Sequence, residues 1–223
     1  MARVFVALRL PRAVADRMAA VGRDLEVKLA DVKWVETENL HFTLRFFGEL
    51  DPGAVERVVL AVTAVTASTT AFTLRLEGIG TFPPHGRPRV LWAGVSTGLA
   101  ELAALASRLE EGFIERGLGR ADRAFAPHLT LGRVRDPNAP GRRGRPARER
   151  IPGQATAAMR AAIEAARFEP VEFSAEAIAV VESRLHPAGP EYLDIHKASL
   201  GGATAAVALD LVRGARDRVG ESE

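Results

Sequence analysis

The chain has no cysteine among its 223 residues, which excludes disulfide bonds, thiolate nucleophiles and cysteine-ligated zinc sites. It also lacks any apolar run close to the roughly 20 residues that span a bilayer. Residues 1–10 lack the long apolar core and small-residue cleavage site of a signal peptide. The formal net charge is only +2. We therefore expect a cytoplasmic globular protein with enough core for one large domain or two small lobes.

Positive charge is unevenly distributed along this nearly neutral chain. Arginines are concentrated between residues 133 and 150, with few acids among them. One interpretation of residues 136–150 is a solvated, mobile insertion. The other is an arm that attracts polyanions such as RNA. Aromatic residues do not alternate with these arginines, so we do not expect base stacking in this segment.

Histidine is scarce, with five in the chain, yet one pattern that contains it occurs twice. The two copies are His41-Phe42-Thr43-Leu44 and His128-Leu129-Thr130-Leu131, and both lie in apolar, strand-like runs. Because successive side chains on a strand point to opposite faces, each histidine shares a face with the threonine two residues later. Two such strands brought together would form a two-histidine site.

The order of predicted elements also repeats. Each half reads strand, helix, histidine-bearing strand, helix, strand, which indicates an internal duplication. In the first half the outer elements are predicted at residues 3–9, 11–29, 51–65 and 71–77, around the strand that carries His41. In the second half they are predicted at 89–95, 99–116, 154–167 and 171–181, around the strand that carries His128. Residues 83–88 are predicted to link the halves, and residues 192–196 to add a last strand.

A pair of histidines suits concerted proton transfer. An imidazole titrates near pH 6.5, so one ring can be neutral while its neighbour is protonated. General base and general acid catalysis of this kind contributes about 10²–10⁴-fold for each proton transfer, and phosphodiester cleavage can use both. Thr43 and Thr130 could donate hydrogen bonds to phosphoryl oxygens, and Arg133 could bind a phosphate as a bidentate donor. By alternation, Arg45 is expected on the face of His41 and Thr43.

Other interpretations of these residues stay open. A duplicated fold could simply repeat a buried, hydrogen-bonded histidine. A zinc site is a further alternative, although neither motif carries an acidic or cysteine ligand. The remaining histidines are expected to be unremarkable, with His85 and His186 in turns and His196 as a structural residue of the last strand. Trp34 is expected either in the core or beside the site, where it could stack on a base.

Longer stretches around the tetrapeptides resemble a known family. Residues 34–49 (WVETENLHFTLRFFGE) and 127–133 (PHLTLGR) are similar to the two motifs of the two-histidine phosphoesterases. Within that group they resemble the RNA 2′,3′-cyclic phosphodiesterases, also called the 2′-5′ RNA ligase family. Residues 182–192 (ESRLHPAGPEY) are similar to the C-terminal signature of that family. The resemblance covers about residues 3–200.

The resemblance implies an α+β, bilobal, duplicated fold. Two mainly antiparallel sheets would face a central cleft, with helices on the outside and pseudo-two-fold symmetry. Residues 1–200 would form one bilobal domain with halves near 1–82 and 89–182, an arrangement that allows strands to be exchanged between the lobes. Residues 201–223 would form a C-terminal helical extension.

The resemblance also implies a function. Members open RNA or nucleotide 2′,3′-cyclic phosphates to 2′-phosphomonoesters without a metal or cofactor. His41 is assigned as proton donor and His128 as proton acceptor, with Thr43, Thr130 and Arg133 binding the phosphate. We expect a monomer with no membrane partner. Two alternatives stay open: a non-catalytic RNA-binding protein that uses the cleft and the arginine-rich arm, and a reversible 2′-5′ RNA ligase.

Overall fold

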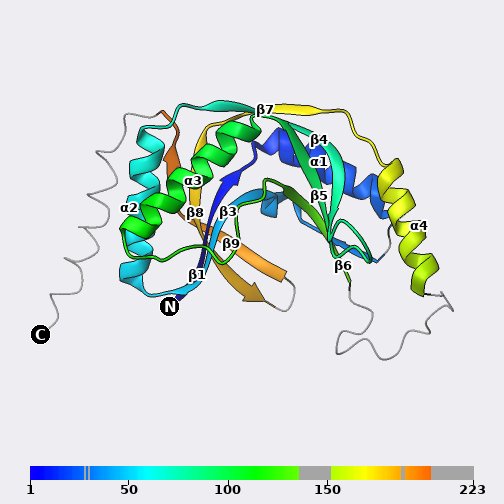
Figure 1. The fold of residues 1–223 in the computed structure, drawn as a ribbon, viewed down its shortest axis with the longest axis horizontal. Coiled ribbons are helices and arrows are strands. Elements are labelled where there is room, and N and C mark those ends of the chain that lie inside the picture. The colour runs from blue at the N-terminus through cyan, green and yellow to red at the C-terminus, as the bar shows by residue number, and fades with distance from the viewer. Residues whose placement is uncertain (28, 30, 136–151, 187–188, 202–223) are drawn as a thin grey trace, which may run out of the picture.

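The protein forms two antiparallel sheets with helices on the outside of an arch (Figure 1), which confirms the predicted α+β fold. The computed structural model describes residues 1–27, 29, 31–135, 152–186 and 189–201. The arginine-rich segment 136–150 and the tail after residue 201 therefore lie outside the described residues. Among the described residues, no helix is both long and apolar enough to cross a membrane.

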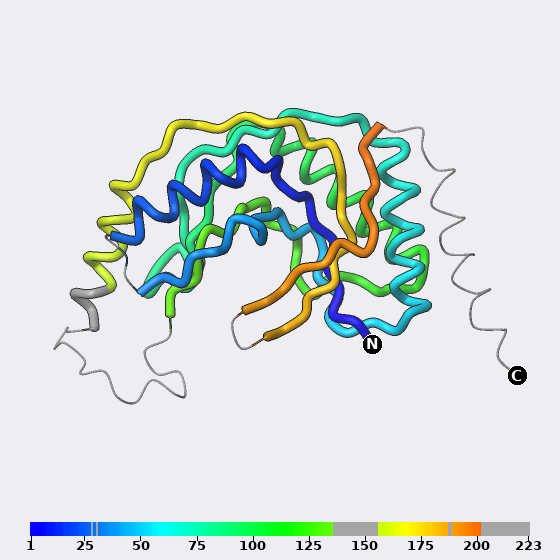
Figure 2. The backbone as a smooth tube through the Cα atoms, turned by 180° about the vertical axis from the view of Figure 1, so that it is seen from behind, coloured from blue at the N-terminus to red at the C-terminus, as the bar shows by residue number. Residues whose placement is uncertain are grey.

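The first sheet, sheet A, has the strand order β3-β1-β8-β9. All neighbouring pairs are antiparallel, and the β8–β9 hairpin extends beneath the arch (Figure 2). Its strands are β1 (Ala2–Arg9), β3 (His41–Leu50), β8 (Ala177–His186) and β9 (Gly189–Ser199). The last of these contains the strand predicted at residues 192–196.

The second sheet, sheet B, has the strand order β2-β6-β5-β4-β7 and is also antiparallel. Its strands are β2 (Val32–Trp34), β4 (Phe72–Phe82), β5 (Val90–Thr97), β6 (Leu129–Val134) and β7 (Val171–Ala175). The predicted single strand at 171–181 was wrong, because the chain leaves sheet B after Ala175 and enters sheet A at Ala177.

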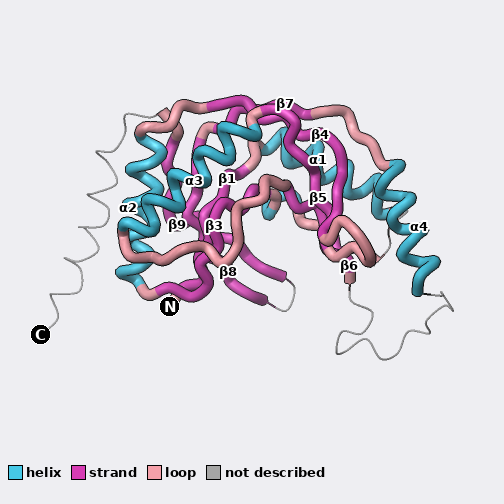
Figure 3. Tube along the Cα trace, viewed as in Figure 1, coloured by secondary structure: helices cyan, strands magenta, loops and turns pink. Residues whose placement is uncertain are grey.

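Helices cover one face of each sheet (Figure 3). Helices α2 and α3 pack against sheet A, whereas α1 and α4 pack against sheet B. The helices are α1 (Arg12–Glu26), α2 (Pro52–Ala67), α3 (Leu99–Glu115) and α4 (Pro152–Ala165), and the 3₁₀ turn η1 (Thr37–Asn39) precedes β3. Asp51 caps α2, because its side chain accepts a 2.9 Å hydrogen bond from the Ala54 amide.

The duplication appears in the sheets as an exchange of strands. Strands β3, β1 and β8 in sheet A occupy the same order as β6, β5 and β4 in sheet B. Strand β4 of the first half thus belongs to sheet B, and β8 of the second half belongs to sheet A. Residues 83–88 do not separate two lobes, because β4 pairs directly with β5 across them. They form the loop of a hairpin within one sheet.

The two faces of sheet A bury different residues. Alternate residues of β1, such as Val4, Val6 and Leu8, point into the main core beneath the helices. Phe5 and Ala7 point the other way and form a separate small cluster with residues of β8 and Tyr192. We call the face of each sheet that the described helices leave uncovered its inner face. The strands that carry the two motifs, β3 and β6, contact one another where the sheets meet.

Candidate active site on the inner faces of two sheets

His41 is held by the turn that precedes its strand. Its Nδ1 lies 2.7 Å from the carbonyl oxygen of Asn39, and a carbonyl can only accept, so Nδ1 carries the proton. In the neutral ring, Nε2 is then an acceptor, and it lies 2.9 Å from Oγ1 of Thr43. The predicted pairing of this histidine with its threonine is therefore present. Proton exchange at His41 is directed to Nε2.

His128 is held in the same way. Its Nδ1 lies 2.6 Å from the carbonyl oxygen of Ala126, again two residues before the histidine. Phe82 meets the His128 ring edge-on, with centroids 5.0 Å apart. His128 lies immediately before β6, and Thr130, two residues on, is half-buried. Both histidines thus present Nε2 for chemistry.

Each motif ends in a β-bulge. Thr43 pairs with Ala7 and Arg45 with Val6, so Leu44 is an extra residue in β3. The second motif repeats this, with Thr130 opposite Trp92 and the next pair displaced by one residue at Leu131. A bulge inserts one residue without a partner and reverses the alternation of faces beyond it. The fourth residue of each tetrapeptide is therefore the point at which strand alternation fails.

The bulge in β3 corrects the expectation for Arg45. Its partner Val6 faces the main core, so Arg45 faces the helices rather than sharing a face with His41. The side chain is 8% exposed and forms an ion pair with Glu110 of α3. Arg45 is thus a structural residue, and simple alternation placed it on the wrong face.

The bulge in β6 has the opposite consequence for Arg133. It pairs with Val90, which lies on the same face of β5 as Trp92, the partner of Thr130. The inner face therefore receives an arginine three residues after the motif threonine. Arg133 is exposed, and its charge acts on the His41 ring of the other sheet. The equivalent position after the first motif is Phe46, so the two halves of the site differ in charge.

Burial lowers the pKa of His41 to about 4. Loss of hydration is the largest cause, since Phe5 and Tyr192 lie with ring centroids 4.9 and 5.4 Å from the imidazole. The positive charges of Arg9 and Arg133 lower the pKa further, whereas the Asn39 carbonyl and Asp194 raise it. His41 is therefore neutral at pH 7 when no anion is bound.

Lys33 was not predicted from the sequence and adds a second cation beside Arg133. The two residues are directly opposite on β2 and β6 and both are exposed. Neither side chain forms an ion pair or hydrogen bond within the described residues. Directly opposed like charges destabilise a strand pair. The pair suits an anion bound at the inner face. The three-residue strand around Lys33 is too short for its sequence pattern to indicate this role.

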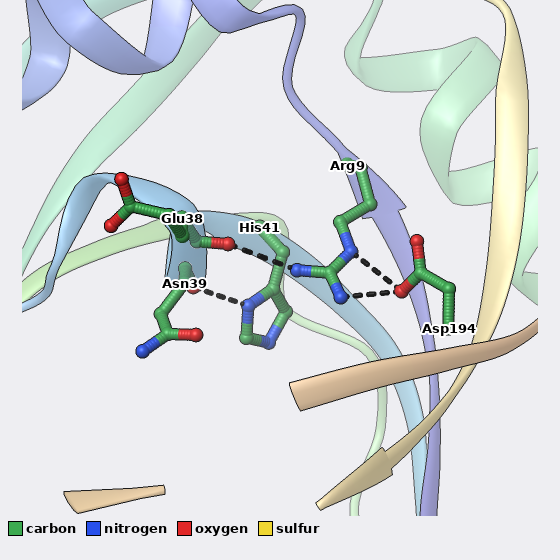
Figure 4. Close-up of polar contacts among 5 residues, drawn as sticks. All are labelled: Arg9, Glu38, Asn39, His41 and Asp194. Atoms are coloured by element: carbon green, nitrogen blue, oxygen red, sulfur yellow. Dashed lines mark hydrogen bonds and ion pairs between the residues drawn. The ribbon is translucent and has the colours of Figure 1, made fainter. Parts of the chain in front are cut away.

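A network of polar contacts beside His41 was also missed. Arg9, on β1, donates to Asp194 of β9 and, over 3.1 Å, to the carbonyl oxygen of Glu38 in η1 (Figure 4). The next residue, Asn39, is the one that accepts from His41. These partners are up to 185 residues apart in sequence, so no local motif could have indicated them.

The remaining predicted candidates are structural. Trp34 packs against Gly22 of α1 and Gly132 of β6, which confirms the core interpretation. His196 lies with Nε2 3.0 Å from Oγ1 of Thr63 in α2, as expected for a structural histidine. No group of three or more histidine, aspartate or glutamate side chains suited to a metal ion occurs in the part of the chain that the structure describes.

The arrangement can bind an anion and move protons next to it. Each imidazole is anchored through Nδ1, which leaves Nε2 for proton transfer, and the Nε2 of His41 lies beside the hydroxyl of Thr43. Arg133 and Lys33 supply positive charge on the same inner face. This combination matches the requirements of phosphoryl chemistry, in which the non-bridging oxygens need donors.

Known proteins are similar to this chain in sequence. The chain is 32% identical over 193 residues to an RNA 2′,3′-cyclic phosphodiesterase of Methanothermobacter thermautotrophicus, covering 86% of this chain and 96% of the relative. It is 31% identical over 209 residues to a protein of the same name from Thermus thermophilus, covering 90% and 91%.

Solved structures show the same fold. The crystal structure of a Thermus thermophilus protein superimposes with a TM-score of 0.68 at 29% identity, over 90% of this chain and 99% of that chain. Escherichia coli LigT complexed with 3′-AMP superimposes with a TM-score of 0.64 at 20% identity, over 90% and 99%. The model of the family described as LigT-like phosphoesterase matches residues 8–92 and 94–192. The chain therefore belongs to the LigT-like phosphoesterase family.

Proposed function

We propose that this protein hydrolyses 2′,3′-cyclic phosphates at RNA ends or on nucleotides, giving 2′-phosphomonoesters. The observation that carries the proposal is the equivalent support of His41 and His128. Each ring is anchored through Nδ1 to the carbonyl two residues earlier, which leaves Nε2 for proton transfer. Family membership and the names of the relatives support the same reaction.

In the proposed reaction, His128 Nε2 takes a proton from water as the water oxygen bonds to phosphorus. The bond from phosphorus to the ribose O3′ breaks, and His41 Nε2 gives its proton to O3′. The products are a 3′-hydroxyl and a 2′-phosphomonoester. Thr43, Thr130 and Arg133 donate hydrogen bonds to the non-bridging oxygens, whose charge increases in the transition state. No metal ion takes part.

The donor role requires His41 to gain a proton before the chemical step. Its pKa of about 4 keeps it neutral without substrate, but an anionic phosphate placed at Nε2 favours the charged imidazole. We therefore propose that His41 takes up a proton as the cyclic phosphate binds. The hydrogen bonds alone do not separate donor from acceptor, because both rings are held alike.

The test is hydrolysis of adenosine 2′,3′-cyclic phosphate, and of an RNA oligonucleotide that ends in a 2′,3′-cyclic phosphate, in the presence of EDTA. Phosphorus NMR distinguishes the products, and we expect only the 2′-phosphomonoester. A 3′-phosphomonoester, or activity that disappears with EDTA, would contradict the proposal. The His85→Ala variant, which alters a histidine in the β4–β5 loop, should match the wild type. We further propose that residues 1–200 act as one monomeric unit.

A further inference from the structure

Arg9 lies at the end of β1 with its guanidinium beside the His41 ring (Figure 4). Three of its donors are in use within 3.1 Å or less, on two different elements. Nε, 3.0 Å away, and one terminal nitrogen bind Oδ1 of Asp194. The other terminal nitrogen donates over 3.1 Å to the carbonyl oxygen of Glu38. A pair that served only to join two strands would not need the bond to Glu38.

The contact with Glu38 connects Arg9 to the histidine. Glu38 and Asn39 are consecutive residues of η1, and the Asn39 carbonyl accepts from His41 Nδ1 over 2.7 Å. Fixing one peptide of a three-residue turn restrains the next, because the backbone has only two soft dihedrals per residue. Arg9 thereby restrains the carbonyl that selects the tautomer of His41.

Small residues on the inner face of sheet A lie between Arg9 and Asp194. Strand β8 lies between β1 and β9, so the side chain must extend across it on the inner face. The inner-face residues there are Ala7 and Ala179, which pair with each other. Both are at most 1% exposed although none of the described helices covers this face. Their small side chains leave room for a long side chain above them.

We propose that Arg9 and Asp194 are positioning residues for His41, which hold its supporting turn and place two opposite charges near its ring. This inference rests on the proposed function of His41 as a proton donor. Arg9 and Asp194 act on the ring with opposite signs, since the cation lowers its pKa and the carboxylate raises it. Asp194 thus offsets part of the positive charge of Arg9 and Arg133, which disfavours protonation of His41.

The groups around the ring come from four elements. Arg9 lies on β1, Arg133 on β6, and Asp194 and Tyr192 on β9. Glu38 of η1 contributes its carbonyl to Arg9, while its carboxylate binds Arg12 over 3.1 Å. Arg133 is unchanged in every variant of Arg9 or Asp194, so any difference in charge near His41 comes from the Arg9–Asp194 pair alone.

The test follows the His41 imidazole by NMR titration in the substrate-free protein and, in parallel, the pH dependence of kcat, which reports the groups that titrate in the enzyme–substrate complex. Asp194→Asn should lower the pKa of His41, and Arg9→Gln should raise it. The alkaline limb of the activity profile should move in the same direction by about 0.5–1 pH unit in each variant. Near that limb, the shift corresponds to a three- to tenfold change in rate. Arg9→Lys keeps the charge but cannot bridge both partners. It should lower kcat several-fold with a smaller shift of the limb.

The control is Glu172→Gln, which removes a partner of Arg75 at 2.8 Å between β4 and β7. It should leave both the titration and the profile unchanged. If neutralising Arg9 and Asp194 shifts the pKa of His41 in the same direction, or not at all, the pair only joins strands and the inference is wrong. If the opposite NMR shifts occur but no variant, the wild type included, hydrolyses a cyclic phosphate, the proposed function fails while the effect on His41 stands.

Discussion

At the scale of single residues, two backbone carbonyls and one pair of charged side chains set the surroundings of the candidate histidines. The tetrapeptides located His41 and His128 and the threonine beside each. The tautomer of each ring depends on a backbone carbonyl two residues earlier, which any residue type could supply. Arg9 and Asp194 meet only through the folded sheet, so composition and spacing carry no trace of the pair.

The depressed pKa of His41 predicts a loss of stability in acid. The folded protein binds a proton at His41 less readily than the unfolded chain does. The stability that comes from neutral His41 is therefore fully present above pH 6.5, and it is lost as the pH falls from 6.5 toward about 4. Between pH 7 and pH 4, the wild type should lose about 3 kcal/mol of unfolding free energy relative to His41→Gln. Denaturant unfolding across this range measures it, with His85→Gln as control. Parallel curves for wild type and His41→Gln would show that His41 titrates normally.

The threonines should contribute to the rate rather than to the fold. Thr43 and Thr130 sit on the inner face with little core contact, so Thr→Val at either position should keep the structure. Loss of one hydroxyl donor should lower kcat about 10²-fold, and Thr→Ser should recover most of it. Steady-state kinetics on a cyclic nucleotide tests this. Unchanged kcat in both valine variants would exclude the hydroxyls from phosphate binding.

At the scale of elements, helices and most strands followed from periodicity and capping, whereas the bulges did not. Leu44 and Leu131 read as ordinary strand residues, yet each is the extra residue of a bulge. That insertion turns Arg45 toward α3 and Arg133 toward the site. Bulges depend on pairing with the neighbouring strand, so a single strand's pattern cannot reveal them.

The ion pair between β3 and α3 should be costly to break. Glu110 binds Arg45 and also accepts a 2.6 Å bond from the Ala121 amide. Because Arg45 is 8% exposed, Glu110→Ala leaves a buried charge without its partner and should lower the unfolding free energy by about 3 kcal/mol. Denaturant unfolding measures the loss against Glu111→Ala, an exposed neighbour. Equal stability of the two variants would mean that Arg45 is readily hydrated.

At the scale of the whole molecule, the duplication was predictable from the order of elements, whereas the resemblance only allowed an exchange of strands and did not specify which strands exchange. The repeated order of elements indicated two halves, but each half contributes its last strand to the sheet of the other. Residues 83–88 looked like a boundary because proline and glycine break both helices and strands, and the same residues suit a hairpin loop. Strands β3 and β6, each of which carries residues of one motif, contact one another.

The cation pair predicts how the assembled site responds to salt. For single-stranded nucleic acid, each phosphate contact adds about 0.7 to the slope of log affinity against log salt concentration. Lys33→Gln should therefore weaken binding of a cyclic-phosphate-ended RNA and lower the slope by about 0.7. Fluorescence anisotropy at several salt concentrations tests this, with exposed Arg23→Gln of α1 as control. A slope that Lys33→Gln leaves unaltered would place Lys33 away from the RNA.

The proposed mechanism requires two histidines to act together on one cyclic phosphate. Its most direct measurement is kcat/KM on an RNA ending in a 2′,3′-cyclic phosphate for His41→Ala, His128→Ala and the double variant. Each single change should lower kcat/KM by about 10²–10⁴-fold or more. The double variant should lose much less than the product of the two losses, because residues that act as a unit are not additive. Near-wild-type hydrolysis by either single variant would contradict a two-histidine site.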